Sequence, residues 1–207
     1  MRFGMTLCHE YPMNDPVRLR FEEHLEQVRA ARDAGFDAVY SGQHYLASDT
    51  QMLQTVPLLA RVAAEAGDMA VGTLVLLLPL HNPVYVAEEM ATLDVICNGR
   101  FVFGIGLGYR DLEFDVFGTR REERVSRFLE SLEIVKRLWT EDDVTHEGRH
   151  FHLKNVNLTL KPLQKPYPPI WVGASSVPAV RRAAELGLPW ILTPNVTAAT
   201  LRDQWDI

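Results

Sequence analysis

Short apolar runs alternate with longer stretches of helical periodicity along most of the 207-residue chain. Continuous apolar runs are typical of strands buried on both faces, and apolar residues three or four positions apart are typical of amphipathic helices. Strands are therefore predicted at residues 2–8, 36–41, 69–78, 101–107, 170–174 and 189–193. Helices are predicted at residues 16–34, 55–66, 83–98, about 120–139, about 177–186 and 198–206. Asp15 is the expected N-cap of the first helix.

This alternation, with its short connections, predicts a parallel sheet joined by right-handed crossovers. The rhythm breaks at residues 143–168, where HFHLKNVNLTLKP alternates with period two and predicts a β-hairpin or an irregular excursion. A (β/α)8 barrel needs eight strand–helix units, and this chain has about six. The pattern therefore fits either an open doubly wound sheet or the N-terminal part of a barrel.

Composition narrows the class of protein. The chain is 47% apolar and 23% charged, as globular proteins are, and its net charge of -6 argues against nucleic-acid or membrane-surface binding. It has no apolar run of 18 residues and no charged leader, and Cys8 and Cys97 lack a CxxC spacing. These features indicate a reduced, cytoplasmic protein. The seven histidines show no metal-ligand spacing, so no metal site is predicted.

A polar cluster follows the second predicted strand, in the sequence FDAVYSGQHY at residues 36–45. In parallel α/β proteins, the carboxyl ends of the strands hold ligands and catalytic groups. His44 is therefore a candidate catalytic residue, either as a base or as a hydrogen-bond donor. A purely structural histidine is the alternative.

Two other strand ends carry small residues. GIGLG at 104–108 lacks the GxGxxG spacing of dinucleotide-binding folds, so we favour close approach of a flat ligand to this backbone. GASS at 173–176 opens a helix, whose free amides and dipole suit a phosphate, although a plain N-cap at Ser176 is the alternative. Arg124 and Arg127 either add charge to such a site or form a solvated helix face.

Four motifs together resemble the bacterial luciferase-like family of flavin-dependent monooxygenases and deazaflavin-dependent oxidoreductases. They are GFDAVYSGQHY at 35–45, VGTLVLLLPLHNPVYVAEEMATLD at 71–94, GRFVFGIGLGYRDLEFDVFGT at 99–119 and PPIWVGASS at 168–176. The resemblance covers essentially the whole chain. It implies a TIM-type (β/α)8 barrel with an insertion near residues 143–168, and a flavin at the carboxyl ends of the strands.

The resemblance also implies which residues contact the ring of the flavin. His44 matches a catalytically important family histidine near the reacting edge of the flavin. Leu74 and Val75 match the position where many members have a non-proline cis peptide against the isoalloxazine face. Gly106 and Leu107 match the strand end that borders the ring and the phosphate in luciferase.

The expected phosphate site lies at the other end of the cofactor. Ser175 and Ser176 match the family's phosphate-binding turn between strand and helix, and Arg124 or Arg127 matches its helix arginine. The chain departs from luciferase at three positions, where Gln43 replaces an acidic residue, Gly106 a cysteine and Leu107 an arginine. These departures weaken the expectation of aldehyde-specific light emission and remain compatible with flavin binding.

The implied function is a monooxygenase that uses FMN, reduced by a separate reductase, and O2 to oxygenate a small organic substrate. His44 would stabilise or protonate the reacting flavin. A hydride-transfer oxidoreductase that uses the deazaflavin F420 is one alternative, and a non-catalytic flavin-binding subunit or inactive fragment is another. The resemblance implies a single luciferase-like domain over residues 1–207 that assembles as a dimer. It lacks the family's last two strands, so we expect it to be truncated or to be completed by a partner.

Overall fold

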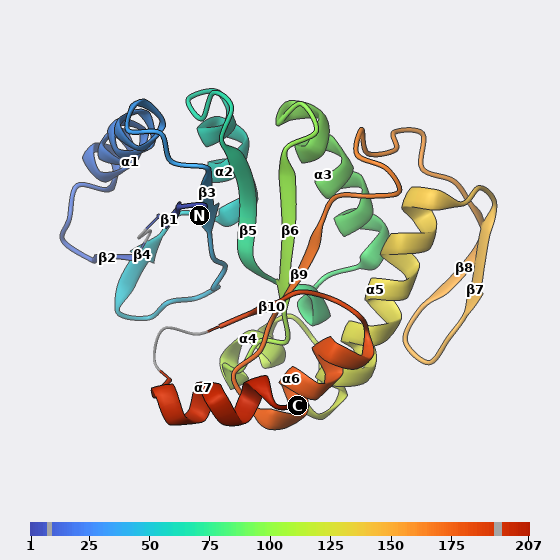
Figure 1. Cartoon of the computed structure of the whole chain (residues 1–207). Coiled ribbons are helices and arrows are strands. Elements are labelled where there is room, and N and C mark those ends of the chain that lie inside the picture. The colour runs from blue at the N-terminus through green and yellow to red at the C-terminus, as the bar shows by residue number, and fades with distance from the viewer. Residues whose placement is uncertain (8–9, 193–195) are drawn as a thin grey trace.

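A parallel sheet forms the centre of the protein in the computed structural model, which describes residues 1–7, 10–192 and 196–207 (Figure 1). The strands follow one another across the sheet in chain order and pair in parallel: β1 (Gly4–Thr6), β3 (Ala38–Ser41), β5 (Ala70–Leu77), β6 (Phe101–Gly106), β9 (Ile170–Gly173) and β10 (Trp190–Ile191). The crossovers contain α1 (Val17–Asp33), α2 (Thr55–Ala63), α3 (Pro83–Ile96), α5 (Arg124–Thr140) and α6 (Val177–Glu185), and α7 (Ala198–Trp205) follows β10. The predicted alternation of strands and helices is confirmed.

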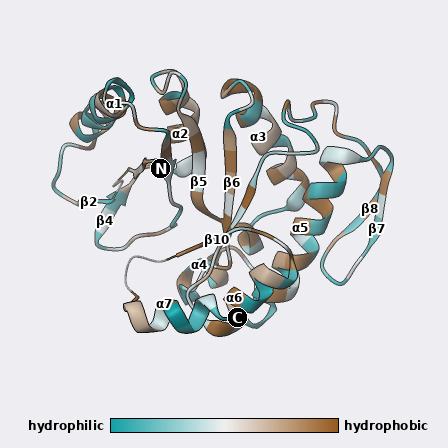
Figure 2. Cartoon of the chain, viewed as in Figure 1, coloured by the Kyte–Doolittle hydropathy of each residue, from teal (hydrophilic) through white to brown (hydrophobic). Residues whose placement is uncertain are grey.

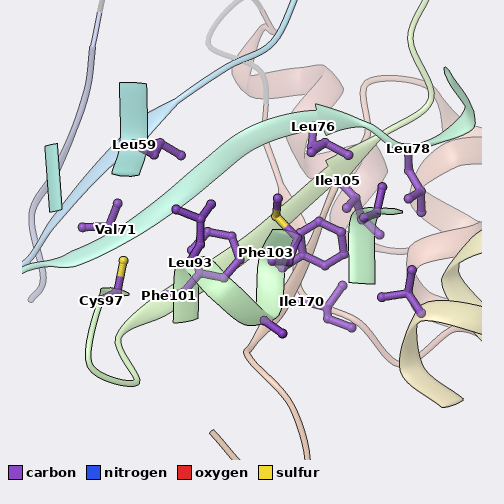
Figure 3. Packing of buried hydrophobic residues seen from close by; sticks show 14 of the residues in the cluster. Leu59, Val71, Leu76, Leu78, Leu93, Cys97, Phe101, Phe103, Ile105 and Ile170 are labelled. Carbon is purple, nitrogen blue, oxygen red and sulfur yellow. The ribbon is translucent and has the colours of Figure 1, made fainter. Parts of the chain in front are cut away.

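The core lies between the sheet and the helices (Figures 2 and 3). Its largest fully buried side chain is Trp139 of α5. The Trp139 ring meets Phe103 of β6 edge-on, with ring centroids 5.6 Å apart, and its indole N–H donates to the Ala87 carbonyl of α3 over 3.0 Å. Burial of such a side chain contributes roughly 3 kcal/mol. These contacts fix α3 and α5 against the centre of the sheet.

The sheet is strongly curled, and glycines on its concave face permit the curl. Tyr40 of β3 and Trp171 of β9 have ring centroids 5.7 Å apart, although β5 and β6 lie between their strands. In a flat sheet, three strand spacings would separate them by about 14 Å. A Cβ on Gly72 would lie 3.0 Å from the Tyr40 ring, so the ring lies over a position without a side chain. The fold is thus a curled half-barrel.

Most predicted boundaries agree with the structure to within two or three residues, with two corrections. Asp15 is not the N-cap of α1: Pro16 occupies that position, and the Asp15 carboxylate instead accepts from Arg20 Nε over 2.8 Å. The second helix ends at Ala63 rather than at residue 66. Asn82 does cap α3, because its side chain accepts from the Val84 amide. Residue 8 of the first predicted strand and residue 193 of the last lie outside the described residues.

Several short elements complete the fold in the described residues. The predicted hairpin in the excursion is present as β7 (Val144–Glu147) and β8 (His152–Val156). The sequence pattern missed an antiparallel ribbon of β2 (Glu10–Pro12) and β4 (Thr50–Met52), and it missed the short helix α4 (Asp111–Val116). Two 3-10 turns, Leu78–Leu80 and Arg121–Glu123, precede α3 and α5.

Two further observations concern the cysteines and the membrane. Cys97 is buried in the core, and burial raises the pKa of its thiol to about 11, so it behaves as a small apolar side chain. Cys8 lies outside the described residues. Within the described ranges, none of the helices has both the length and the apolar character needed to cross a bilayer.

The Gly104→Ala substitution tests the close approach of β5 and β6. A Cβ on Gly104 would lie 2.1 Å from the Thr73 carbonyl oxygen, and backbone in the middle of a sheet cannot move away without loss of register. We expect a loss of about 3 kcal/mol in the free energy of unfolding, measured by urea denaturation. Gly118→Ala is the control, since Gly118 has a φ of +66° and open space around it, and should cost about 1 kcal/mol. Equal losses would contradict the role of this approach.

Candidate functional site

A pocket of about 680 Å³, here called the main pocket, opens where the parallel strands end at their carboxyl termini. The last residues of β5, β6, β9 and β10 and the segments that follow β3, β6 and β9 form its walls. The structure brings most of the predicted site residues together here: His44, Leu74, Val75, Gly106, Leu107, Arg124, Ser175 and Ser176. Arg127 is not among the lining residues.

The floor of the main pocket is the end of β5. The peptide bond between Leu74 and Val75 is cis, as the resemblance implied, and the register between β5 and β6 shifts at this point. A Cβ on Gly106 would lie 2.5 Å from Val75 Cγ2, and one on Gly173 would lie 3.0 Å from Val75 Cγ1. The absence of a side chain at Gly106 therefore leaves space for the Val75 side chain. A ligand in the pocket benefits indirectly, because Val75 can occupy this position.

His44 is held by a buried carboxylate that the sequence pattern did not identify. Its Nδ1 lies 3.0 Å from Oε1 of Glu113, a residue of α4 whose side chain is fully buried. A carboxylate only accepts hydrogen bonds, so Nδ1 carries the hydrogen, and in the neutral ring Nε2 is an acceptor. Nε2 lies 3.4 Å from the hydroxyl of Tyr109, and both residues line the main pocket. His44 thus has one fixed nitrogen and one available for chemistry.

Backbone contacts fix the loop that carries His44. The Tyr45 amide donates to the same Glu113 oxygen over 2.8 Å, and the side-chain amide of Gln54 donates to the His44 carbonyl over 3.0 Å. The Thr55 hydroxyl donates to the Gly42 carbonyl. The start of α2 and the short helix α4 therefore hold this loop from two sides, which limits the movement of the imidazole.

Gln43 joins the histidine loop to the floor of the pocket through a buried neutral network. Its side-chain oxygen accepts from the Leu77 amide and from His81 Nε2, both over 3.0 Å, and its NH2 group donates to the Tyr45 hydroxyl over 2.9 Å. Burial lowers the pKa of His81 to about 4 and raises the pKa of Tyr45 to about 12, so both are neutral near pH 7. A carboxylate at position 43 could only accept hydrogen bonds, so it could not donate to the Tyr45 hydroxyl as the Gln43 amide does. An amide therefore completes this network without adding a charge.

The opposite end of the main pocket is suited to an anion. Ser176 occupies the N-cap position of α6, as the alternative interpretation stated, but its side chain makes no capping hydrogen bond. The carbonyls of Ala174 and Ser175 accept from Trp190 and Gln204, so this turn is supported from behind. Pro178 in the first turn of α6 has no N–H, and the Ala179 N–H donates to the Ser176 carbonyl over 2.9 Å, so it is mainly the helix dipole that favours negative charge here.

Two arginines reach this end, and one of them was not predicted. Arg124 and Arg121 both line the pocket, and Arg124 donates to the Arg121 carbonyl over 2.7 Å. Arg127 instead donates to the Pro79 carbonyl over 3.1 Å and lies over the Phe151 ring at 5.0 Å. Desolvation lowers the pKa of Arg127. Its contacts are those of a packing residue, and the Arg121 guanidinium is already paired with Asp111 over 2.7 Å, so Arg124 is the arginine favoured for binding an anion.

The sequence that forms this arrangement matches a known protein family. A model of the luciferase-like monooxygenase family matches residues 1–206. The chain belongs to this family. Its curled parallel half-barrel matches the fold of luciferase-like neighbours of known structure.

Individual relatives in this family use different cofactors. The chain is 28% identical over 94% of its length to the oxygenase component of a flavin-dependent trigonelline monooxygenase from Acinetobacter baylyi, covering 54% of that protein. It is 30% identical over 87% of its length to an F420-dependent glucose-6-phosphate dehydrogenase from Microbacterium testaceum, covering 58% of it. The crystal structure of monooxygenase RslO1 from Streptomyces bottropensis superimposes with a TM-score of 0.89 at 29% identity, over 100% of this chain and 64% of that one. The chain spans about half the length of the curated relatives it matches.

Two residues of this luciferase-like chain, Glu113 and Arg121, line or support the site and were not predicted from the sequence. Glu113 sits between Asp111 and Asp115 in a short acidic stretch, and no sequence signal separates the one buried carboxylate from its exposed neighbours. Arg121 lies in the 3-10 turn before α5. Among the described residues, no group of three or more His, Cys, Asp or Glu side chains is arranged to hold a metal ion.

Substitutions at Glu113 test its role as the support of His44. Glu113→Gln keeps an acceptor for the Tyr45 amide and for His44, whereas Glu113→Ala leaves both donors unsatisfied in a buried site. We expect Glu113→Ala to lose about 3 kcal/mol in the free energy of unfolding and Glu113→Gln less than about 1 kcal/mol. Urea denaturation measures both. Similar stability in the two variants would show that these hydrogen bonds do not hold the loop.

Proposed function

We propose that this chain forms the flavin-binding part of a monooxygenase that uses reduced FMN and O2 to oxygenate a small organic substrate. The observation that carries the proposal is His44, held by buried Glu113 at the edge of a pocket with a largely apolar floor and a cationic end. A flat ring with a phosphate tail fits this division of the pocket. The flavin-dependent relative matched over 94% of the chain supports it.

The residues that would hold FMN lie at the two ends of the main pocket. Leu74, Val75 and Gly106 provide the surface for the ring, and the turn at Ser175 and Ser176, with Arg124, provides donors for the phosphate. Leu107 also lines the pocket but carries no charge. Positive charge for the phosphate would therefore come from Arg124, at the start of α5. Charge-assisted hydrogen bonds of this kind contribute more than neutral ones.

Within this proposal, His44 handles a proton at Nε2. Bound reduced flavin supplies the electrons that activate O2. When Nε2 takes up a proton, Glu113 stabilises the imidazolium from 3.0 Å away in a fully buried position. The fixed loop keeps Nε2 at the edge of the main pocket. The same proposal includes a separate reductase and a dimeric assembly. It also includes a single domain over residues 1–207 and a cytoplasmic location.

A hydride-transfer enzyme that uses F420 is the second candidate. The His44–Glu113 pair suits the removal of a proton from a substrate hydroxyl while hydride leaves the adjacent carbon. The F420-dependent relative, matched at 30% identity, supports this candidate. A flavin-binding subunit without catalysis is the third, and the same experiment separates all three.

Anaerobic titration with reduced FMN and with reduced F420 tests the function. We expect reduced FMN to bind and to support O2-dependent turnover, and His44→Ala to lower turnover about 100-fold while flavin affinity changes less than about threefold. His152→Ala is the matched control, because His152 is an exposed hairpin residue. Preference for F420 would support the second candidate, and failure of folded protein to bind either cofactor would overturn both enzymatic candidates. Turnover unaffected by His44→Ala would remove the proton role of His44.

Arginine substitutions test the phosphate end of the proposed FMN site. Arg124→Gln should weaken FMN binding about tenfold and leave riboflavin binding unchanged, because only FMN carries the phosphate. Arg127→Gln is a matched control and should affect neither ligand, since that guanidinium is engaged by Pro79 and Phe151. Fluorescence titration measures the affinities. Equal losses of FMN affinity in the two variants would contradict the assignment of Arg124.

A further inference from the structure

A second, smaller cavity of about 290 Å³, here called the side cavity, adjoins the main pocket. Loops that follow three parallel strands build it: Glu10 at the start of the β2–β4 ribbon, residues 47–50 that lead into β4, and Tyr109 with Arg110 after β6. Like the main pocket, it therefore lies at the carboxyl ends of the strands. Its lining is polar, whereas the floor of the main pocket is largely apolar.

His44, Tyr109 and Glu10 line both spaces. The rings of His44 and Tyr109 meet edge-on, with centroids 5.4 Å apart, and the Tyr109 hydroxyl lies 3.4 Å from His44 Nε2. The imidazole that Glu113 holds is therefore shared by the linings of the two spaces. A molecule in the side cavity would lie next to the same imidazole as the edge of a ring in the main pocket.

The charges that line the side cavity are not paired with one another. Within the part of the chain that the structure describes, Glu10 and Asp49 form no ion pair, and the Arg110 guanidinium has only a long contact of 3.4 Å to the Tyr45 carbonyl. Elsewhere on this protein, arginines with nearby carboxylates do pair, as Arg121 does with Asp111 over 2.7 Å. Two carboxylates and one guanidinium give the cavity a net negative charge.

We propose that the side cavity binds the substrate through a cationic nitrogen, a proposal that rests on the monooxygenase function proposed above. A neutral apolar ligand would remove water from unpaired charges without replacing their interactions, which costs free energy. An organic cation instead meets Glu10 and Asp49, and the Tyr109 ring offers a cation–π contact. The cavity volume limits the substrate to a small molecule, whose reactive part faces His44.

Choline and its neutral isostere, 3,3-dimethylbutan-1-ol, are probes that separate charge from shape. We titrate each into the flavin-free full chain and measure binding by ligand-observed NMR. Choline should bind about tenfold more tightly than the neutral alcohol. Asp49→Asn should weaken choline binding about fivefold or more, with FMN affinity unchanged within about twofold, because Asp49 lines the side cavity and not the main pocket.

The matched control is Asp68→Asn, which removes the same charge from an exposed position that lines neither space. Circular dichroism confirms that both variants are folded. Equal affinity for choline and the alcohol, or equal effects of Asp49→Asn and Asp68→Asn, would overturn the proposal. Because the probes are titrated without flavin, a negative choline result is distinguishable from failure of flavin binding, which the separate FMN titration measures.

Discussion

The packing of Val75 against two glycines is the contact on which the site depends. Its side chain occupies the space that a Cβ on Gly106 or on Gly173 would fill, so the ends of β5, β6 and β9 meet through one valine. Two residues earlier in each strand, Gly104 allows the Thr73 carbonyl to approach, and the Gly104 carbonyl accepts from the Thr73 hydroxyl over 2.7 Å. Glycines in these strands therefore set how closely the strands approach. The flat floor of the main pocket is a consequence of this packing.

Two polar side chains, Gln43 and Glu113, hold the histidine loop next to this floor. Gln43 links the histidine loop to Leu77 through neutral partners, and the burial that keeps His81 neutral also keeps this link free of charge near pH 7. Glu113 supports His44 with a carboxylate instead. Its second oxygen, Oε2, is buried and has no hydrogen-bond partner among the described residues. The imidazole thus rests on a carboxylate, whereas the neighbouring link through Gln43 uses neutral partners only.

The main pocket and the side cavity differ in the charged residues that line them. Arg124 places positive charge in the main pocket, Asp49 places negative charge in the side cavity, and Glu10 lines both spaces. Because His44 lines both spaces as well, an anionic cofactor tail and a cationic substrate group would be attracted to different spaces that share one histidine. The same histidine can then serve both ligands without competition between their charges.

The sequence by itself determined the parallel α/β architecture and most of the main pocket. Periodicity found the strands and helices of the sheet because their apolar residues face one continuous core, and the family motifs placed His44, Val75 and Ser176 at strand ends that the fold brings together. Tertiary structure decided the rest. The β2–β4 ribbon and α4 are too short for a periodic signal, and Glu113 is buried only because α4 folds over the His44 loop. Arg127 differs from Arg124 only through its contacts with Pro79 and Phe151, which no local pattern encodes. The sequence directly gives the residue types and their spacing, whereas the partner of each charged group depends on segments far away in the chain.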